Sequence, residues 1–182
     1  MRLFYAVTFG GDTKSRLGAL MDKIRPYCTN GRFSEAENLH LTLAFLGEVP
    51  YCSVAAAKRA ADETEAAPFS AGLNGLGRFK RSGGDIIWIG VKKRKELSEI
   101  YVRLCAALRK NGFKTDSRPY APHVTLARQA VLIPGAQKSL DAVGETINFP
   151  VGGISLMKSE RINGKLRYTE IYSKPLKGGE KT

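Results

Sequence analysis

The tetrapeptide His-x-Thr-Leu occurs twice in this 182-residue chain, and the two copies contain its only two histidines. His40 lies in the stretch LHLTLAFL, and His123 lies 83 residues later in the stretch PHVTLAR. From the Thr and Leu content of the chain, chance would place both histidines in this context roughly once in 30,000 trials. The duplication therefore indicates a repeated fold, a chemistry that uses two copies of one group, or both.

The same offset relates the segments that precede the two motifs. It carries Phe4 and Tyr5, in a strand-like run, onto Ile87 and Trp88 in a second such run, and a helical pattern follows each. The order of strand, helix and motif strand therefore occurs twice. We predict an α+β fold of two lobes related by an approximate two-fold axis, with two antiparallel β-sheets and flanking helices around a central cleft.

Hydrophobic periodicity predicts the individual elements. Runs rich in aromatic and β-branched residues predict strands, and apolar residues spaced three and four apart predict helices, the first of them capped by Asp12 or Thr13. Asn163-Gly164 between two strands predicts a hairpin. The expected strands are 2–9, 39–46, 69–73, 86–91, 123–128, 154–160 and 166–172, and the expected helices are 17–24, 53–67, 97–108 and 136–144.

Length and composition set the organisation of the chain. A hydrophobic content of 43% over 182 residues is enough for one buried core. We expect one domain over 1–182 made of two intertwined lobes, with the motif lobes at about 1–50 and 85–130. The Gly-rich and basic stretch after 69–73 is expected to be a loop, and 175–182 a loose tail.

Charge and cysteine content narrow the class of partner and the compartment. The 29 basic and 17 acidic residues give a net charge of +12, which attracts polyanions such as nucleic acid. No apolar run approaches the roughly 20 residues that span a membrane, and the first residues do not read as a signal peptide. Three cysteines without a Cys-x-x-Cys spacing predict neither a disulfide nor a zinc framework. We expect a cytoplasmic protein.

The two motifs present residue types that suit chemistry at a phosphodiester. In a strand, residues i and i+2 share a face, so His40 lies beside Thr42 and His123 beside Thr125. Two imidazoles can act as acid and base near neutral pH, and two hydroxyls can donate to phosphate oxygens. A metal site normally takes three or four protein ligands, and no His-Glu-x-x-His motif is present, so no metal or other cofactor is expected.

The stretches RLFYAVTF, NLHLTLAFLGEVP, GLGRFKRSGGDIIWIGV and RPYAPHVTLAR resemble the two-histidine phosphoesterases. They are most similar to the RNA 2′,3′-cyclic phosphodiesterases, also called 2′-5′ RNA ligases, from Arg2 to about Leu176. The resemblance implies a bilobal α+β fold and hydrolysis of an RNA 2′,3′-cyclic phosphate to a 2′-phosphomonoester. It implies that His40 donates a proton and His123 accepts one. By the same resemblance Thr42 and Thr125 hold the phosphate.

Arg128 closes the second motif and resembles a phosphate- or nucleotide-contacting arginine of that family. The 83-residue offset places Phe45 at the matching position of the first motif. Strict alternation along a strand would turn Arg128 away from His123. Arg128 therefore needs a strand end or a twist to reach the site, and a solvated arginine is the competing interpretation.

Other basic and aromatic residues are candidates for RNA contacts, although solvated surface or core is the more common role for each. The basic candidates are Arg78, Lys80 and Arg81 in the Gly-rich loop and the run 92–95, and the stacking candidates are Phe4, Tyr5, Trp88 and Tyr120.

Two alternatives to hydrolysis stay open. The same histidines could catalyse 2′-5′ RNA ligation, since an acid–base site works in both directions. The chain could also be a non-catalytic module that binds RNA or nucleotides, although a pure binder does not need a paired acid and base. The leading expectation is a monomeric enzyme acting on RNA ends that carry a 2′,3′-cyclic phosphate.

Overall fold

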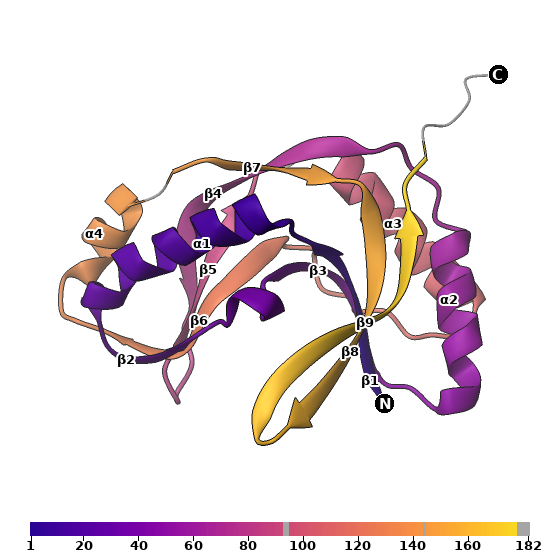
Figure 1. Ribbon diagram of the computed structural model, residues 1–182, viewed down its shortest axis with the longest axis horizontal. Coiled ribbons are helices and arrows are strands. Elements are labelled where there is room, and N and C mark those ends of the chain that lie inside the picture. The colour runs from indigo at the N-terminus through magenta and orange to yellow at the C-terminus, as the bar shows by residue number, and fades with distance from the viewer. Residues whose placement is uncertain (93–94, 144, 178–182) are drawn as a thin grey trace.

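The computed structural model describes residues 1–92, 95–143 and 145–177, which form two antiparallel β-sheets with helices packed against them (Figure 1). The first sheet has the order β3-β1-β8-β9, and the second has the order β2-β6-β5-β4-β7. The predicted α+β class with two antiparallel sheets is confirmed. Each sheet contains one motif strand, β3 or β6.

Both sheets draw their strands from distant parts of the sequence. The first sheet comprises β1 (Arg2–Thr8), β3 (His40–Glu48), β8 (Gly153–Ile162) and β9 (Lys165–Pro175). The second comprises β2 (Cys28–Phe33), β4 (Phe69–Phe79), β5 (Asp85–Val91), β6 (His123–Leu132) and β7 (Ile147–Val151). The chain passes from one sheet to the other several times, so neither sheet is a continuous segment.

The helices are α1 (Gly11–Ile24), α2 (Val54–Asp62), α3 (Lys95–Lys110) and α4 (Ala136–Val143). The predicted side-chain cap of the first helix is wrong, because α1 begins after Gly10 and no side chain caps it. The second helix ends earlier than predicted, because the buried Thr64 hydroxyl donates to the Ala60 carbonyl and ends its last turn. The third helix ends as expected before Gly112, whose φ is +86°.

Three strand predictions were wrong for local reasons. β2 reads CTNGRF, which has turn residues and no alternation, and its pairing with β6 is irregular. β7 contains Pro150, which the sheet tolerates because β7 is an edge strand. β4 continues to Phe79 through the stretch expected to be a loop. Within it, Gly77 lies flat against the Trp88 indole, where a Cβ would come within 2.3 Å of the ring.

The predicted hairpin is confirmed, with Ile162 paired to Lys165 and positive φ at Asn163 and Gly164. The chain does not become loose at residue 175. The Leu176 side chain is buried, and its N–H donates to the Gly152 carbonyl at 2.8 Å. Residues 178–182 of the expected tail lie outside the described residues.

The internal repeat is visible in the strand pairing. The equivalent pairs are Thr8 with His40 and Gly90 with His123, then Ala6 with Thr42 and Trp88 with Thr125. The strands β1 and β5 are therefore related by 82 residues and not by 83. The 83-residue offset predicted for the strands before the motifs is therefore wrong by one residue, because Trp88 is the counterpart of Ala6 and not of Tyr5.

Candidate active site

His40 lies at the start of β3 with both ring nitrogens occupied. Its Nδ1 is 2.7 Å from the main-chain oxygen of Asn38, and its Nε2 is 3.0 Å from the Thr42 hydroxyl. Because a carbonyl oxygen can only accept, Nδ1 carries the hydrogen in the neutral ring. Nε2 is therefore the atom that can exchange a proton with a substrate.

His123 repeats this arrangement on β6. Its Nδ1 is 2.8 Å from the main-chain oxygen of Ala121, so Nδ1 carries the hydrogen in the neutral ring and Nε2 is the atom that can exchange a proton. Thr125 shares its face, and the Ser34 hydroxyl fixes the strand by donating to the Thr125 carbonyl at 2.9 Å. Both motifs thus fix the tautomer through the carbonyl two residues before the histidine.

The two motif strands β3 and β6 lie in contact. The Tyr120 hydroxyl, just before β6, donates to the Thr42 carbonyl at 3.3 Å and links them. Burial lowers the pKa of His40, the Asn38 carbonyl opposes this, and the positive charges of Arg128 and His123 lower the pKa further.

A β-bulge explains how Arg128 reaches the histidine face. Leu126 and Ala127 are both buried, and the pairing of β6 with β5 skips one residue between Thr125 and Ala127. The bulge reverses the alternation, so Arg128 is exposed on the same side as His123. The expected obstacle to a role for Arg128 is thereby removed.

The first motif strand has the same bulge at Leu43 and Ala44, both buried. It brings Phe45, whose side chain is 61% exposed, to the position that corresponds to Arg128. One motif strand therefore presents an aromatic ring where the other presents a guanidinium group.

Aromatic rings surround both histidines. The Phe4 and Tyr168 ring centroids lie 4.8 and 5.0 Å from that of His40, and the Phe79 centroid lies 5.1 Å from that of His123. Sequence reasoning missed Phe79 because its strand was read as a loop. It missed Tyr168 because only the curl of the β8–β9 hairpin brings this ring to His40.

Several candidates for RNA contacts have other roles. Phe4 and Tyr5 are buried, which corrects their assignment as stacking residues. Arg78 forms an ion pair with Asp85 at 2.9 Å. Tyr120 stacks on Tyr101, and Trp88 packs against both Phe79 and His123. Lys80 and Arg81 are exposed, and 93–94 lie outside the described residues.

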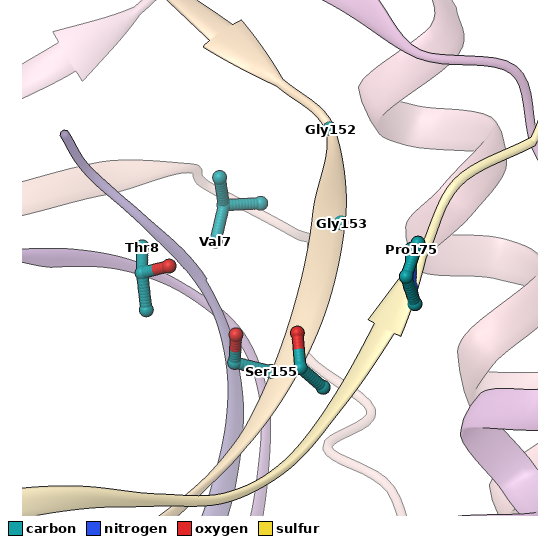
Figure 2. Close-up of a pocket in the computed structure, with 7 residues that line it drawn as sticks. Val7, Thr8, Gly152, Gly153, Ser155 and Pro175 are labelled. Atoms are coloured by element: carbon teal, nitrogen blue, oxygen red, sulfur yellow. The ribbon is translucent and has the colours of Figure 1, made fainter.

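An open hollow of about 270 Å³ adjoins the first motif (Figure 2). Thr8, which pairs with His40, lines it together with Ser155 and Ser173. Figure 2 shows Thr8 on β1 and Ser155 on β8, and Ser173 belongs to β9. A hydroxyl-lined space therefore begins one strand away from His40.

No group of three His, Cys, Asp or Glu side chains in the described ranges of the chain could hold a metal ion. Within the same ranges, no helix is long and apolar enough to cross a membrane.

Two antiparallel sheets that each contain a His-x-Thr strand, with these two strands in contact, make this a fold of the two-histidine phosphoesterase class. The chain belongs to the 2′-5′ RNA ligase superfamily, whose family model matches residues 13–163.

Known relatives agree with this assignment. The chain is 38% identical over 149 residues to an RNA 2′,3′-cyclic phosphodiesterase of Geobacillus stearothermophilus, an alignment that covers 78% of this chain and 44% of that protein. It is 32% identical over 145 residues to the Escherichia coli K12 enzyme of the same name, covering 78% and 77%. The crystal structure of E. coli LigT complexed with 3′-AMP is similar with a TM-score of 0.80 and 28% identity, covering 96% and 97%.

Proposed function

We propose that the protein hydrolyses RNA 2′,3′-cyclic phosphate ends to 2′-phosphomonoesters by metal-independent acid–base catalysis. The observation that carries the proposal is the pair of histidines in duplicate strands, each with Nδ1 bonded to a carbonyl, so that Nε2 is the atom that can exchange a proton with a substrate. The names of the relatives support the substrate class. The protein acts as a monomer in the cytoplasm in this proposal, and its three unpaired cysteines suit a reducing compartment.

The proposed reaction assigns one proton transfer to each histidine. His123 accepts a proton through Nε2 from the water that attacks phosphorus. The bond between phosphorus and the ribose 3′-oxygen breaks, and His40 gives its Nε2 proton to that oxygen. The products are a 2′-phosphate and a free 3′-hydroxyl, and one proton has moved from water to the leaving oxygen. Hydrolysis is the net direction, because water is far more abundant than an RNA hydroxyl.

Thr42 and Thr125 hold the non-bridging oxygens of the reacting phosphate in this proposal, and Arg128 binds phosphate of the same substrate beside them. Replacing either threonine with Val is expected to cost about 1.5–3 kcal/mol of transition-state stabilisation, because a hydrogen bond to a charged oxygen is lost. The check is kcat/KM on a cyclic-phosphate end. Thr→Ser at the same positions should retain most of the activity, and Thr169→Val on β9 is the control. Unchanged kcat/KM in both Val variants would show that the hydroxyls do not contact the phosphate.

The direct test of the proposal is turnover of an oligonucleotide with a 2′,3′-cyclic phosphate end in excess EDTA. We expect full activity, because neither proton transfer needs a metal ion. Activity that is lost in EDTA and restored by a divalent ion would contradict the mechanism. Binding without turnover would favour the non-catalytic alternative, and joining of two RNA ends without hydrolysis would favour ligation.

Phe45 supports a nucleotide as the substrate. The Phe4 ring lies 4.8 Å from the His40 ring and 5.9 Å from the Phe45 ring, which puts the exposed Phe45 ring within about 11 Å of His40. A base attached to the reacting ribose can stack on a ring at that distance.

Phe45→Ala is therefore expected to lower kcat/KM on an RNA end roughly 5-fold to 150-fold, which corresponds to about 1–3 kcal/mol of stacking. Phe45→Tyr should retain the activity. Val102→Ala on α3 removes a side chain of similar exposure, 60%, and serves as the control. An equal loss on a cyclic phosphodiester that lacks a base would argue against stacking.

A further inference from the structure

Arg32 and Arg128 are directly opposed across the antiparallel strands β2 and β6. Both side chains are exposed, and residues that face each other across two strands share one side of the sheet. Like charges in this position repel each other. Among the residues that the structure describes, neither guanidinium group has a hydrogen-bond acceptor or an acidic partner. An anion would relieve this repulsion.

We propose that Arg32 and Arg128 together bind one phosphodiester of the RNA chain, the one that precedes the cyclic end. This inference rests on the proposed function and extends it from the reacting nucleotide to the next one. Two guanidinium groups can each offer paired N–H donors to phosphate oxygens. The bulge in β6 puts Arg128 on the same side of the strand as His123, so the pair borders the candidate active site.

The test compares two substrates. A dinucleotide with a cyclic end carries the additional phosphate, and a mononucleoside 2′,3′-cyclic phosphate does not. Arg32→Gln is expected to lower the ratio of kcat/KM for the dinucleotide to that for the mononucleotide roughly 10-fold or more. Lys23→Gln, on α1, removes one exposed charge elsewhere and should leave the ratio unchanged.

A second measurement needs no turnover. Inorganic phosphate should raise the melting temperature of the parent more than that of Arg32→Gln, while the unliganded variant melts no lower than the parent. An unchanged ratio of kcat/KM, which means an equal loss on both substrates, would overturn the proposal. If the parent hydrolyses neither substrate but phosphate still stabilises it selectively, the proposed function fails and this anion site stands.

A separate observation concerns Asn38, which lies just before β3. Its side-chain amide donates to the Leu166 carbonyl at 2.9 Å and accepts the Tyr168 N–H at 3.2 Å, while its own carbonyl is bonded to His40. β3 and β9 are the two edges of the first sheet. Asn38 therefore links the two edge strands through its side-chain amide and holds the His40 imidazole through its main-chain carbonyl.

We infer that Asn38 is a positioning residue, which orients His40 by tying the start of β3 to the β8–β9 hairpin. An amide can donate to a carbonyl and accept from an N–H at once, which a carboxylate cannot. The clamp fixes the carbonyl that selects the His40 tautomer, and it brings the Tyr168 ring against the imidazole. The matching carbonyl for His123 belongs to Ala121, whose methyl group cannot form a clamp.

The two histidines of the chain allow a direct test by imidazole ¹⁵N NMR. In Asn38→Asp and Asn38→Ala, the His40 signals should move toward a mixture of tautomers, while the His123 signals stay as in the parent. On a cyclic phosphate, kcat should fall roughly 10-fold to 100-fold with little change in KM, as part of the acid contribution is lost. Asn111→Ala removes a remote amide and is the control.

Hydrogen exchange adds a measurement on the parent alone. The Tyr168 N–H lies at a sheet edge and should exchange slowly, because Asn38 accepts it. Rapid exchange there would contradict the clamp. Unchanged His40 signals in both variants would show that Asn38 only stabilises the fold. If the His40 signals shift in the variants but the parent has no phosphodiesterase activity, the role of Asn38 is supported and the proposed function is refuted.

Discussion

His40→Ala is expected to lower kcat/KM on an RNA 2′,3′-cyclic phosphate end by about 10²–10⁴-fold. The ribose 3′-oxygen is a poor leaving group, and in the proposed mechanism the Nε2 proton of His40 makes its departure possible. The same variant should recover much of the loss on a phosphodiester with a nitrophenol leaving group, because nitrophenolate departs without a proton.

Recovery of this kind separates loss of the acid from general damage to the site. If His40→Ala lowered kcat/KM by the same factor on both substrates, His40 would not be the group that protonates the leaving oxygen. Thermal melting of the variant serves as the control for folding, since His40 packs against Phe4 and Tyr168.

His123→Ala is expected to lose a similar factor, about 10²–10⁴-fold, on both substrates. The attacking water still needs a base when the leaving group improves, so the nitrophenyl substrate should give no recovery. The measurement is kcat/KM of this variant on the same two substrates. If His123→Ala were the variant that recovers, the acid and base roles would be reversed.

The electrostatics of the site bear on these roles. Burial and the charges of Arg128 and His123 lower the pKa of His40, which favours the neutral ring and not the acid form. A bound phosphate brings negative charge beside the imidazole and acts in the opposite direction. The substrate itself should therefore help to protonate His40, and the acid should form mainly in the complex.

The duplicated motif was enough to predict the class of fold and the placement of each histidine on the same strand face as a threonine. Short-range rules also sufficed for the hairpin, because Asn163-Gly164 specifies its turn locally. These features depend on residues that are near neighbours in the sequence.

The features that could not be predicted depend on contacts between distant segments. The bulge that brings Arg128 to the histidine face comes from the register of β6 against β5, which alternation alone does not reveal. Asn38 and Tyr168 meet across 130 residues because the first sheet curls. The side chains of β2 show no strand pattern. β2 is a strand because its backbone pairs with β6, and the sequence does not reveal that pairing.

The pH dependence of kcat/KM on a cyclic-phosphate end tests the two-histidine mechanism most directly. We expect a bell-shaped profile for the parent, because His123 must be neutral and His40 protonated. The alkaline limb of kcat should lie at higher pH than that of kcat/KM, since bound phosphate raises the pKa of His40 that burial lowers in the free protein. In His40→Ala the alkaline limb should disappear. A parent profile with one limb or none between about pH 5 and 8, or an alkaline limb that persists without His40, would contradict the mechanism.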